Sequence, residues 1–185
     1  MADYQTLKHT FGPLYDRDSR LLILGSFPSV KSREAGFFYG HPQNRFWKVI
    51  AALTSSDVPT TIDEKKCLLH DSHIALWDTI WQCDIIGSSD SSIRNVIPTD
   101  LSQILKEADI RQIFCNGATS ARLFKRYQEP VLGRSAIRLP STSPANAACS
   151  LDRLIREWEP VRTVLSGGQT EGGNAFSALK PVSGM

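Results

Sequence analysis

The chain has 185 residues, of which 41% are hydrophobic, and this length and composition suit one compact domain with a buried core. Its formal net charge of +2 argues against a strongly basic protein that coats nucleic acid, but it allows a small basic surface that contacts nucleic acid locally. No apolar run is long enough to span a membrane, and the N-terminal segment MADYQTLKHTF lacks the apolar core of a signal peptide. We therefore expect a soluble, cytoplasmic protein with no membrane partner.

Four short apolar runs predict β-strands, and helical patterns lie between them. The predicted strands span residues 21–24, 74–77, 113–115 and 136–139. Helices are expected after a cap at Asn44, from Asp63, after a cap at Thr99, and over residues 118–127 and 150–158. Strands that alternate with helices are typical of an α/β fold with a mostly parallel sheet and helices on both faces.

Residues 1–162 are expected to form a single domain, because the segment that follows keeps no sustained period. Gly and Ser are frequent over residues 163–185, and we expect this tail to be flexible. The four cysteines form no CxxC pair and have apolar neighbours, so we expect buried, reduced thiols rather than a metal site. They are Cys67, Cys83, Cys115 and Cys149.

Polar and small residues gather directly after the predicted strands. They form the segments 25–28 (GSFP), 78–79 (DT), 116–117 (NG) and 140–146 (PSTSPAN). Right-handed crossovers place the carboxyl ends of parallel strands on one edge of a sheet, where α/β folds bind their ligands. We therefore expect a single crevice at this edge.

The segment 22–47, LILGSFPSVKSREAGFFYGHPQNRFW, is the most informative part of the chain. A short strand leads into a loop with three adjacent aromatic residues, and the loop enters a helix at the NRFW step. Its rings can stack on a nucleobase and its polar groups can bind a base edge, with almost no strong acid or base.

Three motifs resemble those of the uracil-DNA glycosylase superfamily. The sequences GSFPS and YGHPQNRFWKVI are most similar to the motifs of the mismatch-specific uracil/thymine-DNA glycosylases, which are of the type GINPG and HPANRFWKVI. LPSTSPAN, residues 139–146, stands where this superfamily has a second motif of the type HPSPLS or NPSGLS. The resemblance implies a three-layer α/β/α sandwich around a short, mostly parallel four-stranded sheet, with no metal and no cofactor.

Two departures from these motifs indicate a particular branch. Phe27 stands where the GINPG motif has an Asn that positions water, and Ser141 stands where HPSPLS has its His. This combination is similar to the hypoxanthine-DNA (deoxyinosine) glycosylases. That branch has first motifs of the GSFP type and is thought to use the Asn of the NRFW step, here Asn44.

Two residues are candidates for catalysis. The Asn44 amide can accept a hydrogen bond from water and donate one to the base or sugar, and the alternative is a plain helix cap. Asp78 can accept from N1–H of hypoxanthine or act as a general base toward water, and the alternatives are a cap or a salt bridge.

Five residues are candidates for binding the flipped base. Tyr39 matches an aromatic residue that stacks on the base in the mismatch-specific enzymes, although it could instead anchor its loop in the core. Phe27 would form a pocket wall, and backbone N–H groups from Gly25 through Ser26 could donate to the base. Asn116 could bind the base or simply stabilise the turn that it forms with Gly117.

The 140–146 loop is expected to press on the DNA minor groove and backbone through small hydroxyls and backbone amides. Its candidate DNA-binding residues are Ser141, Thr142, Ser143, Pro144 and Asn146. A set of basic residues could follow one DNA strand near the rim. They are Lys31, Arg33, Arg45, Lys48, Arg134 and Arg138.

These features predict a monomeric, monofunctional DNA glycosylase for base-excision repair. It would bind double-stranded DNA that contains a deaminated base and hydrolyse the N-glycosidic bond of the flipped base, most readily hypoxanthine, to leave an abasic site. Preference for uracil or ethenocytosine in mismatches, or a non-catalytic damaged-DNA binder, are the alternatives. A hydrolase of small molecules that uses Ser26 or Ser141 is a weaker one, because the chain has no GxSxG motif.

Overall fold

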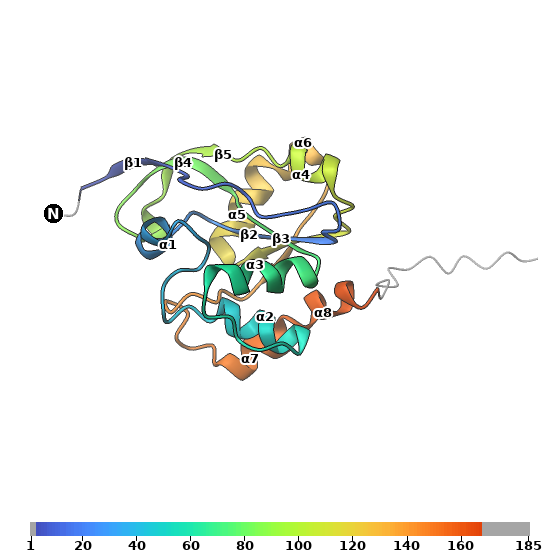
Figure 1. Cartoon of the computed structure of the whole chain (residues 1–185). Coiled ribbons are helices and arrows are strands. Elements are labelled where there is room, and N and C mark those ends of the chain that lie inside the picture. Colours follow the sequence, from blue (N-terminus) through green and yellow to red (C-terminus); the bar gives the residue numbers. More distant parts are fainter. Residues whose placement is uncertain (1–2, 168–185) are drawn as a thin grey trace, which may run out of the picture.

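The computed structural model describes residues 3–167, and its centre is a four-stranded parallel sheet (Figure 1). In sheet order the strands are β3 (Ile74–Asp78), β2 (Leu21–Gly25), β6 (Gln112–Asn116) and β7 (Ile137–Leu139). Every residue of β2 and β3 is buried, as expected of strands covered on both faces. The predicted α/β class, the parallel sheet and all four predicted strands are confirmed.

Helices cover both faces of this sheet (Figure 1). On one face lie α2 (Phe46–Thr54), α3 (Ile62–Asp71), α7 (Leu151–Glu157) and α8 (Glu159–Leu165). The opposite face is covered by α5 (Ala118–Tyr127), which packs against β6 and β7. The shorter helices are α1 (Val30–Ala35), α4 (Ser102–Glu107), α6 (Glu129–Leu132) and the 3-10 turn Asp90–Ser92. The arrangement is the expected three-layer sandwich.

A second sheet, which the sequence analysis missed, adjoins the first. It is antiparallel, in the order β1 (Gln5–Lys8), β4 (Ile80–Ile85) and β5 (Arg94–Pro98). Most residues of β1 and β5 are at least partly exposed, so neither strand contains a continuous apolar run. A small separate core lies beneath this sheet and includes Phe27, Ile80, Cys83, Ile85 and Leu123.

Several predicted element boundaries were wrong. Helix α3 begins at Ile62, one residue before the predicted start at Asp63, because a capping box between Thr61 and Glu64 precedes it, in which each side chain accepts from the other residue's backbone N–H. Helix α4 begins at Ser102, and the Thr99 hydroxyl instead donates to the carbonyl oxygen of Asp78 at 2.6 Å. Helix α8 continues to Leu165 and so includes the first three residues of the expected tail, 163–185; residues 168–185 lie outside the described residues.

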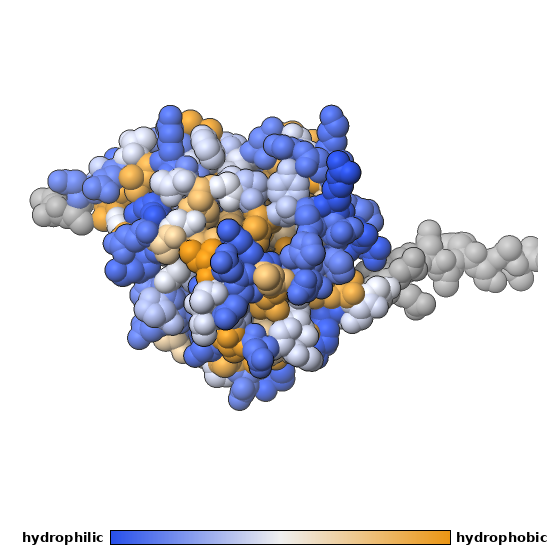
Figure 2. Space-filling model, viewed as in Figure 1, coloured by the Kyte–Doolittle hydropathy of each residue, from blue (hydrophilic) through white to orange (hydrophobic). Residues whose placement is uncertain are grey.

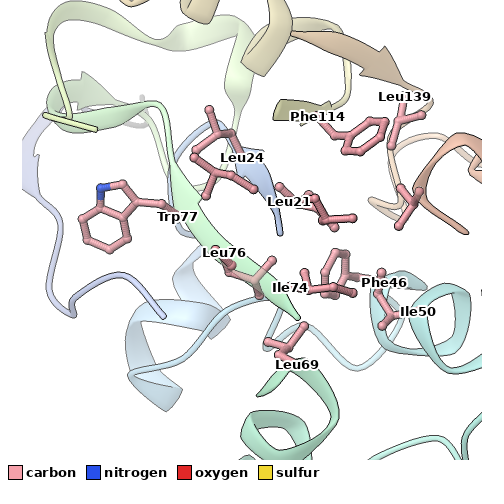
Figure 3. Close-up of a cluster of buried hydrophobic side chains, with 14 of the residues drawn as sticks. Leu21, Leu24, Phe46, Ile50, Leu69, Ile74, Leu76, Trp77, Phe114 and Leu139 are labelled. Atoms are coloured by element: carbon pink, nitrogen blue, oxygen red, sulfur yellow. The ribbon is translucent and has the colours of Figure 1, made fainter. Parts of the chain in front are cut away.

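The main core anchors the start of α2 against the sheet. Figure 3 shows Phe46 and Ile50 of α2 among the side chains of β2, β3 and β6, and both are completely buried. Truncation of a buried Phe costs about 3–5 kcal/mol, so this contact fixes the position of the chain just before the helix. That chain carries Asn44.

The face drawn in Figure 2 is largely hydrophilic, with small apolar patches between polar side chains. Within residues 3–167 no helix combines the length and the apolar character needed to cross a membrane.

All four cysteines are free, and three are buried as expected, but Cys67 is exposed.

Candidate active site

The carboxyl ends of three neighbouring strands bring the predicted site residues together. Gly25 ends β2 and is paired in register with Asp78 at the end of β3. On the other side of β2, Asn116 ends β6 and is paired with Leu139 of β7. The adjoining loops carry Tyr39, Asn44 and residues 140–146 to the same edge.

Gly25 is required by the close approach of Asp78. A Cβ atom at this position would lie 2.2 Å from Oδ1 of Asp78 and 3.4 Å from the Tyr39 hydroxyl oxygen. Any other residue would displace the carboxylate. This glycine was expected to allow a close approach of the base, whereas the side chain that occupies the space is that of Asp78.

Asp78 is buried and is held by a residue that the sequence analysis did not identify. Its Oδ2 atom lies 2.7 Å from Nε2 of His9, and both residues are only 5% exposed. The His9 ring lies among aromatic side chains, with centroids 4.3 Å from Trp77 and 4.6 Å from Phe11. Its Nδ1 atom is buried without a partner within residues 3–167. A salt bridge was one alternative for Asp78, and the His9 contact has that geometry if the ring is protonated.

Tyr39 occupies an unusual backbone conformation at the centre of the edge. Its φ of 52° lies in the left-handed region, which is strained for an aromatic residue and is often associated with functional sites. Its ring stacks on Phe46, with centroids 3.9 Å apart and planes 19° from parallel. One face of the ring is thus covered by the protein, and a base can stack only on the other.

The Tyr39 hydroxyl is buried and forms no hydrogen bond within the described part of the chain. Burial raises the pKa of this phenol well above its usual value, and the nearby Asp78 carboxylate raises it further, while the Asn116 amide acts in the opposite direction. The hydroxyl is therefore a neutral donor at all physiological pH values.

Asn44 and Asn116 are joined by one buried threonine. The Asn44 Oδ1 atom accepts from the Phe46 backbone N–H and from the Thr142 hydroxyl, each at 2.9 Å. The Thr142 backbone N–H donates to Oδ1 of Asn116 at 3.0 Å, and Nδ2 of Asn116 donates to the Thr142 hydroxyl oxygen at 2.9 Å. Arg45 occupies the cap position of α2, but the Asn44 side chain still satisfies a free N–H of the first turn.

Thr142 is therefore misplaced in the predicted set of DNA contacts. It is completely buried, and its hydroxyl is used by the two asparagines. Its neighbours Ser141, Ser143, Pro144 and Asn146 keep part of their surface in solvent.

Arg45 holds this loop from inside the protein and does not lie free at the rim. Its guanidinium donates to the carbonyl oxygens of Ser143 at 2.8 Å and Asn146 at 3.0 Å, and it also contacts that of Cys149. Asn146 in turn donates to the carbonyl oxygen of Ser141 at 2.9 Å. Two other predicted rim arginines also bind backbone carbonyls: Arg33 that of Pro28 and Arg134 that of Ile110, both at 2.6 Å.

The loop after β2 is fixed by one polar contact and one apolar contact. The Ser26 hydroxyl lies 3.0 Å from both carboxylate oxygens of Asp90, a residue that the sequence analysis did not identify. Asp90 is exposed overall, but desolvation of its carboxyl group raises its pKa; the Ser26 hydrogen bond opposes this shift, and the negative charge of Asp78 adds to it. Phe27 is buried in the second core, edge-on to His9. Its ring thus lies beside His9, the partner of Asp78.

Two surface hollows lie away from the strand ends. One, of about 420 Å³, lies between β5 and α5 and is lined in part by Arg94, Arg122 and Arg126. The other, of about 440 Å³, lies beside α3. Neither contains a predicted site residue, so the geometry of the strand edge, rather than a large cavity, identifies the candidate site.

The fold and the three motifs agree with a match to a known family. Residues 13–162 match the family described as the Uracil DNA glycosylase superfamily. The chain belongs to this superfamily. The matched residues include the GSFP, NRFW and STSPAN segments, so the resemblance that those segments indicated is confirmed.

Relatives of this uracil DNA glycosylase superfamily member include two archaeal proteins named hypoxanthine DNA glycosylase. That of Methanosarcina acetivorans is 31% identical over 159 residues, which cover 84% of this chain and 98% of the relative. That of Methanosarcina barkeri is 30% identical over 145 residues, which cover 75% and 88%. A solution NMR structure of a candidate uracil DNA glycosylase from Methanosarcina acetivorans matches with a TM-score of 0.74 at 29% identity, over 88% of this chain and 99% of that one.

Proposed function

We propose that the protein is a monofunctional DNA glycosylase of base-excision repair that releases hypoxanthine from deoxyinosine in duplex DNA and leaves an abasic site. The names of the two archaeal relatives support hypoxanthine as the substrate. The observation that carries the reaction is that one sheet edge holds both the Tyr39–Asp78 pair and the Asn44–Thr142–Asn116 hydrogen-bond chain. Together these residues offer one face of the Tyr39 ring for stacking, amide N–H groups as hydrogen-bond donors, and the Asp78 carboxylate as an acceptor.

The reaction breaks the bond between C1′ of deoxyribose and N9 of the purine and forms a bond from C1′ to a water oxygen. The bonding electron pair leaves with the base, the water loses a proton, and the base gains one. Positive charge develops on the sugar and negative charge on the base. Preorganised donors aimed at the leaving base contribute about 3 kcal/mol each in sites of this kind.

The site residues divide between the base and the sugar. We assign the ring face of Tyr39 that does not stack on Phe46 to stacking on the flipped hypoxanthine, and the amides of Asn44 and Asn116 to its edge. Asp78 is assigned to the positive charge on the sugar and to the proton of the attacking water. Ser141, Ser143, Pro144 and Asn146 are assigned to the DNA backbone and minor groove. We propose that the protein acts as a monomer without a cofactor.

A base-release assay tests this proposal. Duplexes labelled on one strand and carrying inosine, uracil, xanthine or ethenocytosine are incubated with excess protein and then treated with alkali, which cleaves abasic sites. We expect the fastest cleavage at inosine. Intact strands across the panel would refute a glycosylase, and a clear preference for uracil would refute the assignment of hypoxanthine.

The role of Asp78 has its own test. Replacing Asp78 with Asn removes the charge but keeps the size, and we expect single-turnover release of hypoxanthine to fall by about 100-fold or more. The matched control is Asp109→Asn, because the Asp109 side chain is 72% exposed and pairs only with Arg111 at 3.5 Å within the described residues. Equal rates for the two variants would remove Asp78 from the mechanism.

A further inference from the structure

The hydrogen-bond chain Asn44–Thr142–Asn116 has one possible arrangement of its protons. A backbone N–H can only donate, so the Asn44 atom that faces the Phe46 N–H is its oxygen. For the same reason the Asn116 atom that faces the Thr142 N–H is its oxygen, and its nitrogen therefore faces the Thr142 hydroxyl. That hydroxyl accepts from Asn116, so its own hydrogen points to Oδ1 of Asn44.

This arrangement determines which end of the Asn44 amide is available to a ligand. Its oxygen already accepts two hydrogen bonds, which is its ordinary capacity. Its nitrogen donates to no other residue among 3–167, and the side chain is only partly buried. Asn44 therefore presents N–H donors, and not a carbonyl oxygen, to whatever binds at the sheet edge.

We propose that Thr142 is a positioning residue that commits Asn44 to donating a hydrogen bond to the departing base. The inference deepens the proposed glycosylase function and depends on it. As the C1′–N9 bond breaks, the electron pair spreads over the purine ring, and a ring nitrogen becomes a stronger acceptor for the Asn44 N–H. The attacking water is then held by the Asp78 carboxylate and not by Asn44. This carboxylate, at the same sheet edge, accepts the proton of the water.

The burial of Thr142 makes its hydroxyl hard to replace. The residue is 0% exposed, so bulk water does not reach the place of the hydroxyl. Without it, Nδ2 of Asn116 loses its acceptor and Oδ1 of Asn44 loses one of its two donors. Asn44 is then restrained by the Phe46 N–H alone.

The first experiment compares Thr142→Val, which keeps the shape and removes the hydroxyl, with Thr142→Ser, which keeps the hydroxyl. Single-turnover release of hypoxanthine is measured with saturating protein, together with the Kd for a duplex that carries a tetrahydrofuran abasic-site analogue. We expect Thr142→Val to slow release by about 10- to 100-fold without changing the Kd, and Thr142→Ser to stay within about threefold of the wild type. Thr54→Val is the matched control, because the Thr54 hydroxyl bonds only to groups on and after α2 within the described residues.

A double-variant cycle tests whether Thr142 acts through Asn44. In the Asn44→Ala background, Thr142→Val should cost several-fold less than in the wild type, because the Asn44 amide is gone and only the contact of Thr142 with Asn116 remains. The same fold-loss in both backgrounds would overturn the proposal. So would an unimpaired Thr142→Val.

A third variant keeps the inference testable even if Thr142→Val fails to fold. Asn44→Asp retains the oxygen that faces Phe46 and Thr142 and replaces the N–H donors with an acceptor. If Asn44 donates to the base, this variant should be as slow as Asn44→Ala, about 100-fold or more below the wild type. If Asn44→Asp keeps most of its activity, Asn44 holds water and the inference is wrong. A wild-type protein that releases no base would instead refute the proposed function itself.

Discussion

The Nε2 atom of His9 lies 2.7 Å from Oδ2 of Asp78, and this buried contact links residues that are 69 positions apart. The backbone N–H of His9 also donates to the carbonyl oxygen of Trp81, which extends the pairing of β1 with β4. The N-terminal strand therefore supports a candidate catalytic carboxylate, and the second sheet is part of the scaffold of the site.

Replacing His9 with Phe tests this support. The variant keeps an aromatic ring among Phe11 and Trp77 but leaves Oδ2 of Asp78 without its partner. We expect the free energy of unfolding, measured by urea denaturation, to fall by about 1–3 kcal/mol, and base release to slow. His70→Phe is the control: the His70 side chain is 68% exposed, and a surface change of this kind shifts stability by about 0.5 kcal/mol at most. Equal stability of the two variants would contradict a supporting role for His9.

Gly25→Ala should damage the site directly. The added methyl group would meet Asp78 Oδ1 at 2.2 Å, so either the carboxylate or the end of β2 must move. We expect a loss of about 1–3 kcal/mol in unfolding free energy and a larger proportional loss in base release. Gly12→Ala is the matched control, since nothing lies within 4 Å of its Cβ position. A fully active Gly25→Ala protein would show that the Asp78 position is not critical.

The ring and the hydroxyl of Tyr39 should contribute differently. Tyr39→Ala removes the ring that stacks on Phe46 and offers its other face to the base, and we expect substrate binding to weaken by about 1–3 kcal/mol. Tyr39→Phe keeps the ring and removes a buried hydroxyl that has no partner within residues 3–167, so stability should be unchanged or higher. Kd values for an inosine duplex, with urea denaturation, measure both effects. Equal losses of binding in both variants would assign the role to the hydroxyl instead.

Asp90 should make stability depend on pH with a defined sign. Desolvation of its carboxyl group raises its folded-state pKa above the ordinary value of 3.8, although the residue as a whole is exposed, so its favourable contribution is complete below that value and is lost as pH rises through the folded pKa. At neutral pH the ionised group is therefore unfavourable, and Asp90→Asn should raise the urea midpoint at pH 7 and have little effect near pH 4.

Asp100→Asn is the control of opposite sign. Backbone and side-chain hydrogen bonds from Ser102 lower the pKa of Asp100, so its contribution is present above the unfolded pKa and is lost as pH falls through the folded pKa. The variant should therefore lower the urea midpoint at pH 7, with a difference that shrinks toward acid. An Asp90→Asn protein that behaves in the same way as Asp100→Asn would contradict the assigned cause.

Local patterns predicted the central sheet well and the second sheet not at all. Residues buried on both faces, such as Leu21 to Leu24, form continuous apolar runs that need no partner to be recognised. Strands β1 and β5 are mostly exposed and pair with β4 at long range, and their residues carry no comparable signal. Thr99 was misread as a cap because many polar residues near a helix start can cap it, and packing selects among them.

The motifs located Tyr39, Asn44, Asp78 and Asn116 because each stands next to a strand end or in a segment with recognisable spacing. Thr142 was placed in the right loop but assigned to the DNA, since nothing local distinguishes a hydroxyl that faces a phosphate from one that joins two asparagines. His9 and Asp90 were missed because each matters only through a partner, Asp78 or Ser26, that the fold brings near.

Motifs and local residue patterns were enough to establish the superfamily, the central strands and the residue types at the sheet edge. This was possible because burial patterns and turn chemistry involve residues that are neighbours in the sequence. The direction of the Asn116 amide, the contact of Thr142 with Asn44 and the partner of Asp78 depend on residues that are 26, 98 and 69 positions apart. Such contacts exist only after the layers have packed, so they were decided by the tertiary structure alone.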